Sequence, residues 1–165
     1  MTTNIEKLLQ NDVILDACSV YSLYATSRFD EILRWIPGQV YIASHVERNE
    51  VKQLYNPATG ASDIEIDLSK SKTSGLLLVT KPAGGGEALD AVNFAAAMSK
   101  NKPGKNTGEA ITGAIAKARK WTMVTDDVDA TEYLAQQGLD TTLITTLHVL
   151  ECWSSSNCLP LNDVQ

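Results

Sequence analysis

The chain lacks long apolar runs, a cysteine framework and a secretory leader pattern. None of its hydrophobic segments approaches the roughly 20 residues that a membrane-spanning helix requires, so we expect no membrane partner. Its three cysteines are an odd number without metal-binding spacing, which argues against a disulfide framework. The first residues contain neither the cationic region nor the apolar region of a signal peptide. Together these absences predict a protein of the reducing cytoplasm.

Basic residues are also scarce. The chain has 14 Lys and Arg against 20 Asp and Glu, for a formal net charge of −6. Nucleic-acid-binding proteins usually carry a basic surface, so the overall charge gives no support for such a partner. A cluster of carboxylates neutralised by a bound metal would account for part of the acidic excess.

Size and patterning define the fold class. A chain of 165 residues, 44% of them hydrophobic, is long enough to bury a core and favours one domain over residues 1–165. We predict strands at residues 13–17, 40–42, 76–80, 121–125 and 139–145, and helices at 19–26, 30–35, 44–55, 87–99, 109–120, 130–137 and 147–153. This alternation predicts a three-layer α/β/α fold with a mostly parallel central sheet.

One segment is less regular than the rest. Residues 64–68 alternate between apolar and polar side chains, as a half-exposed strand does. The polar stretch 69–75 reads as a turn before the apolar run 76–80. These two runs fit either a hairpin or two neighbouring strands, so we expect a hairpin or insert around residues 56–86.

Acidic residues stand at the boundaries of the predicted elements. Asp16 follows the first apolar strand, Glu109 opens a helix, and Asp126 and Asp127 follow a later strand. In an open α/β sheet, ligands bind beyond the carboxyl ends of the strands, so such positions can converge on one cleft. Several carboxylates without an obvious neutralising cation suggest a bound divalent metal.

Two further acids lie three positions apart on one predicted helix. Ser44 and Glu47 have the spacing of a capping box, which gives Glu47 a structural explanation. Glu50 lies deeper in the helix and has no such explanation. We therefore favour Glu50 as the functional acid.

Each of the other acids also has a structural interpretation. Asp16 has the position of an N-cap for the helix that follows it. Glu109 lies in a first helical turn, where the helix dipole stabilises a carboxylate. Asp126 or Asp127 can cap the next helix. The recurrence of acids at matching ends of successive units nevertheless predicts a metal site.

The order of these acids resembles that in the PIN-domain family of metal-dependent ribonucleases. The resemblance rests on the acid after the first strand, Glu50 followed by Val51, the Gly108-Glu109-Ala110 helix start and the Thr125-Asp126-Asp127 turn. It covers about residues 13–153. The third acid of the family is more often Asp than Glu. The Gly-Glu-Ala and Asp-Asp-x-x-Ala patterns are similar to those of a prokaryotic subfamily related to VapC toxins.

The resemblance implies roles for individual residues. Asp16, Glu50, Glu109 and Asp127 correspond to the metal-binding and catalytic quartet. Asp126 is implied as an additional ligand, Glu47 as a substitute for Glu50, and Thr125 as the residue that supports the turn. Segment 56–86 is longer than in compact members of the family.

The same resemblance implies a cofactor, a substrate and partners. The cofactor is Mg²⁺ or Mn²⁺, and the substrate is single-stranded RNA cleaved by metal-activated water. The only basic cluster close in sequence to the acids is Lys100, Lys102 and Lys105. These lysines are candidate phosphate contacts, with a solvated loop as the alternative. A toxin role with an antitoxin partner, and a homodimer, are further family expectations.

Two other classes of function remain open from the sequence. The first is a degenerate PIN-like binding module, which the net charge of −6 and the few basic residues favour. The second is a metal-dependent phosphatase that acts on a small molecule. Metal-dependent cleavage of RNA, tested beside a phosphomonoester, separates these alternatives from a ribonuclease.

Overall fold

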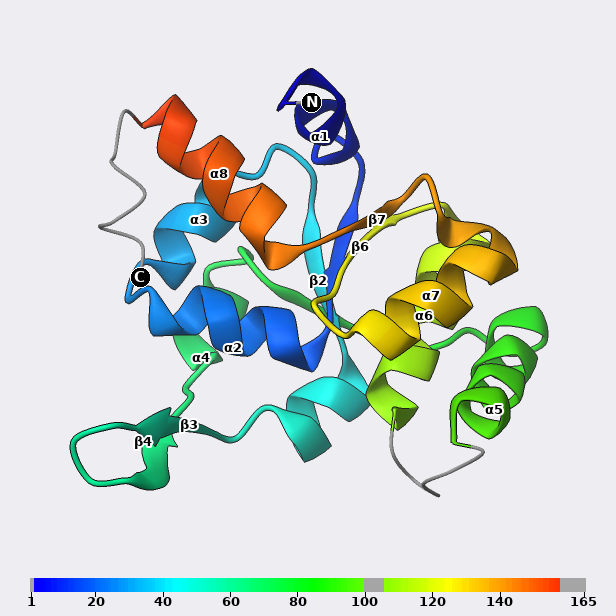
Figure 1. The fold of residues 1–165 in the computed structure, drawn as a ribbon, viewed down its shortest axis with the longest axis horizontal. Coiled ribbons are helices and arrows are strands. Elements are labelled where there is room, and N and C mark those ends of the chain that lie inside the picture. The colour runs from blue at the N-terminus through cyan, green and yellow to red at the C-terminus, as the bar shows by residue number, and fades with distance from the viewer. Residues whose placement is uncertain (1, 100–105, 158–165) are drawn as a thin grey trace.

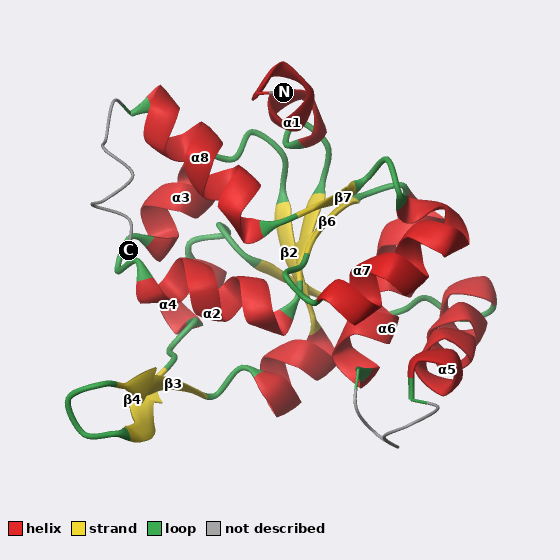
Figure 2. Ribbon diagram, in the orientation of Figure 1, coloured by secondary structure: helices red, strands yellow, loops and turns green. Residues whose placement is uncertain are grey.

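The computed structural model describes residues 2–99 and 106–157. In this part of the chain a five-stranded sheet is covered by helices on both sides, as Figures 1 and 2 show. The predicted α/β/α fold is therefore confirmed. The strands of the sheet are β1 (Val13–Leu15), β2 (Val40–Ala43), β5 (Leu78–Thr80), β6 (Thr122–Val124) and β7 (Leu143–Ile144).

The strand order is β5-β2-β1-β6-β7, and each neighbouring pair is parallel. Strand β1 lies in the middle, with Leu15 opposite both Ile42 and Val124. Strands β2 and β5, which follow β1 in the chain, lie on one side of it. Strands β6 and β7, which come later in the chain, lie on the other side. Such a reversal opens a crevice at the carboxyl ends of the two strands that flank it. Here those strands are β1 and β6.

The helices form two groups around the sheet. Helices α1 (Thr2–Leu8), α2 (Ala17–Ala25), α3 (Phe29–Trp35) and α8 (Thr146–Ser156) form a first group, which lies to the left and top in Figure 1. Helices α5 (Gly86–Met98), α6 (Thr107–Arg119) and α7 (Val128–Leu134) form a second group on the right. The remaining helical segments are α4 (Ser69–Thr73) and the π-helical turns η1 (Val46–Glu50) and η2 (Ala135–Leu139).

Strand β1 forms the centre of the core. Its three residues, Val13, Ile14 and Leu15, have no exposed surface. A strand covered on both faces is apolar at nearly every position, which explains the uninterrupted hydrophobic run that precedes Asp16. Helix α6 contacts β1, β2 and β6, so it covers the same central strands from one face.

None of the helices in the described part of the chain is both long and apolar enough to cross a membrane.

The predicted helix over residues 44–55 is wrong in its second half. The helical segment ends at Glu50, and Val51 has an extended backbone with φ −80° and ψ 96°. Strand β3 (Gln53–Asn56) then pairs antiparallel with β4 (Ala61–Glu65). The turn between them closes with hydrogen bonds from the Thr59 and Gly60 N–H groups to the Asn56 carbonyl. Hairpin pairing with the next strand therefore prevails over local helical periodicity.

The irregular segment also differs from its prediction. A hairpin is present, but it is formed by β3 and β4 and projects from the body of the molecule in Figure 1. Strand β5 belongs to the central sheet, where it pairs with β2. The stretch predicted as a polar turn at 69–75 contains helix α4. Alternation of side chains does not identify the strand partner, and this explains the error.

The last elements agree more closely with the sequence. The predicted helix over 130–137 corresponds to α7 and η2, and Gly138 has the left-handed φ of 93° that favours glycine. The strand predicted at 139–145 is limited to Leu143–Ile144.

Candidate metal centre

Asp16 lies at the carboxyl end of β1 and caps helix α2. Its Oδ1 accepts a hydrogen bond of 2.6 Å from the Ala17 N–H. Its own N–H donates to the Val124 carbonyl at 3.1 Å, which joins it to the end of β6. The side chain is fully buried. Asp16 is thus an N-cap, as the structural interpretation proposed, and it also lies at the sheet crevice.

The second carboxylate oxygen of Asp16 is held by two donors. Thr125 Oγ1 donates to Asp16 Oδ2 at 2.9 Å, and Cys18 Sγ donates at 3.2 Å. Burial raises the pKa of Asp16, its hydrogen bonds oppose this, and the charge of Glu50 adds to the increase. Burial also raises the pKa of the Cys18 thiol to about 11, so the thiol keeps its proton and acts as a donor. The orientation of the Asp16 carboxylate is therefore fixed before any ligand binds.

Glu50 is packed against the start of helix α6. A Cβ atom built on Gly108 would lie 2.2 Å from Glu50 Oε2 and 2.4 Å from Oε1. Only glycine leaves room for this carboxylate, and the Gly108 N–H donates to it. Burial and then the charge of Glu109 raise the pKa of Glu50, while His45 and the Gly108 N–H lower it.

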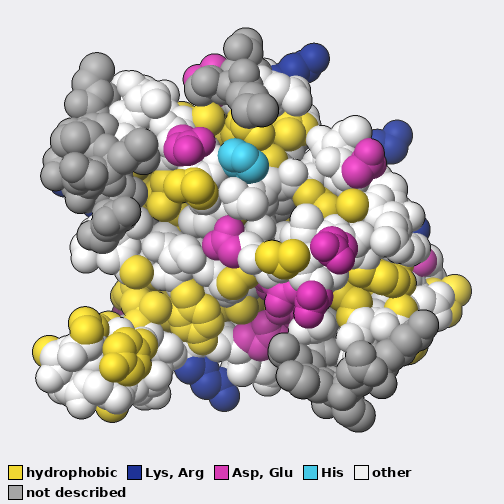
Figure 3. All heavy atoms as spheres, viewed as in Figure 1, with side chains coloured by type: hydrophobic (Ala, Val, Ile, Leu, Met, Phe, Trp, Pro, Cys, Tyr) yellow, Lys and Arg dark blue, Asp and Glu magenta, His cyan; other side chains and the backbone are white. Residues whose placement is uncertain are grey.

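The two glutamates and Asp16 form one cluster. Each of Asp16, Glu50 and Glu109 has a carboxylate oxygen within 4.8 Å of the others. They come from the β1–α2 junction, the end of η1 and the first turn of α6. Figure 3 shows acidic side chains gathered near the centre of the face on which these segments meet. The fold thus brings together acids that are 34 to 93 positions apart.

Thr125 links this cluster to the acidic pair that follows it. Its side chain is buried, and its Oγ1 both donates to Asp16 and accepts from the Asp127 N–H at 3.3 Å. The residue expected to support the turn therefore bonds to both sides of it.

Asp126 and Asp127, the acidic pair after β6, make contacts outside the cluster. Asp127 caps helix α7, with Oδ1 accepting from the Ala130 N–H at 2.7 Å. Asp126 Oδ1 accepts from the Thr146 N–H at 2.8 Å, and Oδ2 accepts from the Ser22 hydroxyl at 3.3 Å. Asp126 thereby joins α8 to α2. Neither residue belongs to the group of three converging carboxylates.

Glu47 also lies outside that group. Lys72 Nζ is 2.5 Å from Glu47 Oε1, and Arg48 Nε is 4.0 Å from Oε2. The cap residue of η1 is His45, which makes no side-chain capping bond, and the Glu47 carboxylate is bound by Lys72, so the described residues do not show the predicted capping box of Ser44 and Glu47. Glu47 instead anchors α4 through Lys72, while Glu50 joins the cluster.

Three residues at the cluster were not singled out as site residues from the sequence. Besides Cys18, they are His45, whose Nε2 lies 3.6 Å from Glu50 Oε1, and Tyr21, whose hydroxyl donates to the Glu50 carbonyl. His45 Nδ1 lies 3.2 Å from the Asn49 amide nitrogen. Their neighbours along the chain contain no motif that predicts these contacts. The candidate phosphate contacts Lys100, Lys102 and Lys105 lie outside the described residues.

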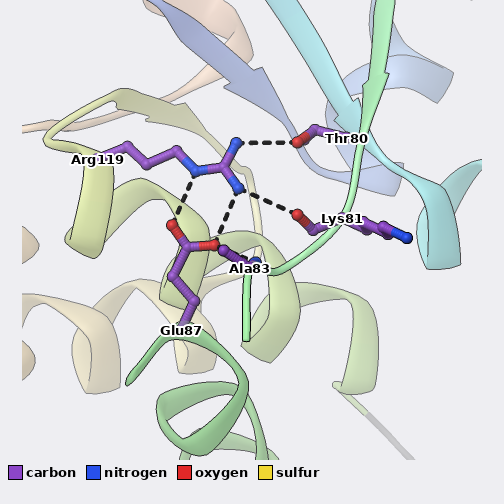
Figure 4. A network of polar contacts seen from close by, with 5 residues as sticks. All are labelled: Thr80, Lys81, Ala83, Glu87 and Arg119. Carbon is purple, nitrogen blue, oxygen red and sulfur yellow. Dashed lines mark hydrogen bonds and ion pairs between the residues drawn. The ribbon is translucent and has the colours of Figure 1, made fainter. Parts of the chain in front are cut away.

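A separate network holds helix α6 in place. Arg119, at the last position of α6, forms two bonds with the Glu87 carboxylate, at 2.8 and 2.9 Å. It also donates to Thr80 Oγ1 at 2.9 Å and to the Lys81 carbonyl at 3.0 Å, as Figure 4 shows. This pair of charges raises the pKa of Arg119 and lowers that of Glu87. Arg119 thus ties the end of α6 to β5 and to the start of α5.

The chain matches no known family model and no curated protein. The chemistry of the cluster must therefore be judged from its own donor set. Three carboxylates that converge within 4.8 Å repel one another, and two of them have a raised pKa. Hard divalent cations take carboxylate oxygens as ligands, so the donor set fits Mg²⁺ or Mn²⁺.

Proposed function

We propose that this protein is a PIN-like, metal-dependent ribonuclease that hydrolyses single-stranded RNA. The observation that carries the proposal is the convergence of Asp16, Glu50 and Glu109 at the crevice between β1 and β6. This is the position at which open α/β sheets bind their ligands. The order of the three acids along the chain agrees with the family resemblance in the sequence.

The geometry of Glu50 supports a site built for a cation. Gly108 has no room for a side chain because the Glu50 carboxylate occupies that space. A carboxylate held this close to two others costs electrostatic free energy unless a positive charge offsets the repulsion. Asp16, Glu50 and Glu109 would hold Mg²⁺ or Mn²⁺ through their oxygens. When bound, such an ion lowers the pKa of a water molecule and neutralises phosphate charge.

The chain's own residues would orient this chemistry. Asp16 has no exposed surface, and Thr125 and Cys18 fix its Oδ2. Glu50 keeps 27% of its side chain exposed, so solvent and substrate reach the cluster from the side of η1. His45, beside Glu50, is positioned to donate a hydrogen bond to a phosphate oxygen at that opening.

The partners and location belong to the same proposal. Single-stranded RNA is the substrate class, and Lys100, Lys102 and Lys105 are the proposed phosphate contacts. A toxin role in the cytoplasm, with an antitoxin partner and a homodimeric enzyme, follows from the family resemblance. Metal-dependent RNA cleavage is the first of these features to test, since the others depend on it.

The test is cleavage of a labelled single-stranded RNA with and without Mn²⁺. We expect cleavage by the unmodified protein with Mn²⁺, and a loss of at least 100-fold in Glu50→Gln and Glu109→Gln. Glu47→Gln is the matched control and retains activity, because Glu47 lies outside the cluster. Full activity in both cluster variants would contradict the proposal. Hydrolysis of p-nitrophenyl phosphate without RNA cleavage would indicate a phosphatase, and Mn²⁺ binding without either activity a binding module.

A further inference from the structure

A buried threonine lies on the same helix as Gly108 and Glu109. Thr112, on helix α6, has no exposed surface, and its Oγ1 has no hydrogen-bond partner among the described residues. Thr146 is the other buried residue in this part of the chain with an unpartnered side-chain oxygen. Nearly all buried hydroxyl groups in proteins are hydrogen-bonded, so each exception calls for a physical explanation.

Helix geometry places Thr112 one turn below the cluster. It follows Gly108 by four positions and Glu109 by three, and residues at these spacings share a helix face. Their Cβ atoms lie about 5–6 Å apart. The Cβ position of Gly108 is itself 2.2 Å from the Glu50 carboxylate. Thr112 therefore lies one helical turn from the point at which the Glu50 carboxylate contacts α6.

The fold alone gives no reason for a hydroxyl at this position. A threonine inside a helix commonly bonds to the carbonyl three or four residues earlier, yet Thr112 Oγ1 makes no such bond. Valine has the same shape and lacks the polar group, so it would fill the space without leaving an oxygen unpaired. A partner that is present when the cluster holds a ligand would account for the hydroxyl.

We propose that Thr112 is a positioning residue of the metal centre, whose hydroxyl binds a water molecule that supports Glu50 and Glu109. This rests on the proposed function, because it assumes that the cluster binds a divalent cation. Carboxylates that hold metals are themselves oriented by hydrogen bonds from surrounding groups, and loss of such a bond typically lowers metal affinity about 10- to 100-fold. A buried water with several polar partners is a common element of protein interiors.

The experiment compares Thr112→Val and Thr112→Ser with the unmodified protein. Titration calorimetry measures the Kd for Mn²⁺, and thermal unfolding without metal measures Tm. We expect Thr112→Val to bind Mn²⁺ at least tenfold more weakly while its metal-free Tm is equal or higher. Thr112→Ser, which keeps the hydroxyl, binds within about twofold of the unmodified protein. Thr146→Val is the matched control, since it removes the other unpartnered hydroxyl, and its Mn²⁺ affinity is unchanged.

Each contrary result has a distinct meaning. If the unmodified protein does not bind Mn²⁺, the metal centre itself is refuted and this role for Thr112 with it. If the unmodified protein binds and Thr112→Val binds equally well, only the role of Thr112 is refuted. A lower metal-free Tm in Thr112→Val, or an equal loss of affinity in Thr146→Val, shows a general packing effect and also overturns the proposal.

Discussion

Thr125 Oγ1 donates a hydrogen bond of 2.9 Å to Asp16 Oδ2, across 109 positions of the chain. This bond joins the carboxyl ends of β6 and β1, which are neighbours in the sheet. The same oxygen accepts from the Asp127 N–H, so Thr125 connects the acidic cluster to the cap of α7. One hydroxyl thereby positions both the candidate metal ligand and the turn that follows β6.

Removal of this hydroxyl tests its contribution to stability. Thr125→Val removes one of the two donors to the buried Asp16 Oδ2 and the acceptor of the Asp127 N–H, so we expect a loss of about 1–3 kcal/mol in the free energy of unfolding. Urea denaturation at neutral pH measures it. Thr141→Val, at an exposed position, is the control and changes stability by less than about 0.5 kcal/mol. Equal stability of the two variants would show that the bond is energetically irrelevant.

A methyl group at Gly108 tests the contact with Glu50. Alanine ordinarily stabilises a helix interior over glycine by about 0.8–1 kcal/mol. Gly108→Ala should not show this gain, because its Cβ would force the Glu50 carboxylate, the end of a flexible side chain, to shift. Gly86→Ala, in α5 with open space around it, is the matched control and keeps or gains stability.

A double variant separates this overlap from other effects of the methyl group. In Gly108→Ala/Glu50→Ala the carboxylate that causes the overlap is absent. We expect Gly108→Ala to stabilise the protein more in this background than on its own, which a double-mutant cycle from urea unfolding detects. Additive effects of the two substitutions would refute the contact as the cause.

Stability without metal should depend on pH through the two carboxyl groups with raised pKa. Asp16 and Glu50 have ordinary values of 3.8 and 4.5, and folding raises both. A group with a raised pKa binds more protons in the folded state than in the unfolded state. Its stabilisation is complete below the ordinary value and is lost as the pH rises through the raised value. The contribution of these two groups to the free energy of unfolding should therefore fall as the pH increases from about 4.

Substitutions identify the groups responsible for this pH dependence. Glu50→Gln should flatten the decrease, since the amide does not titrate. Asp30→Asn should act in the opposite sense, because the Ser71 hydroxyl lowers the pKa of Asp30 and its stabilisation is lost as the pH falls. Urea unfolding at a series of pH values, in chelator, measures both. A pH profile of Glu50→Gln identical to that of the unmodified protein contradicts the assignment.

A bound divalent cation should offset the repulsion between the carboxylates of the cluster. A ligand that binds only the folded state at 100 times its Kd stabilises by about 2.7 kcal/mol. Mn²⁺ should raise Tm accordingly, and more strongly at higher pH because the carboxylates must be deprotonated to bind it. Asp16→Asn should lose this increase, whereas Glu47→Gln should retain it. Differential scanning fluorimetry with EDTA as the reference records the shift.

The Arg119–Glu87 pair should contribute more to stability than an exposed ion pair. Its side chains are 26% and 11% exposed and share two hydrogen bonds, so Glu87→Gln should cost about 1.5–3 kcal/mol. Glu31→Gln is the control, since the Arg28–Glu31 pair is 42% and 57% exposed and should contribute about 0–1 kcal/mol. Urea unfolding compares the two variants, and similar losses would contradict a special role for Arg119.

The fold class and the central acids were accessible to sequence reasoning for a simple reason. A buried parallel strand is mostly apolar, so β1 and the Met123–Val124 part of β6 appear as short hydrophobic runs that are followed by a polar residue. Asp16 and Thr125 stand at those ends. Sequence spacing also left open whether Asp127 caps a helix, and the structure assigns it that contact.

The hairpin and the choice between Glu47 and Glu50 depended on contacts that no local pattern contains. Strand β3 is paired with β4, and Glu47 lies outside the cluster, in an ion pair with Lys72 of α4. The reason for a glycine at position 108 likewise becomes clear only from its contact with Glu50.

By itself, the sequence determined the layered α/β architecture and the positions of acidic residues after the ends of strands. Both follow from periodicity, since burial of a strand or of a helix face dictates which positions are apolar. Tertiary structure alone decided which three acids converge, which ones cap helices, and which hydroxyl and thiol orient Asp16. The physical reason is that these outcomes depend on distances across the crevice between β1 and β6, between residues that are remote along the chain.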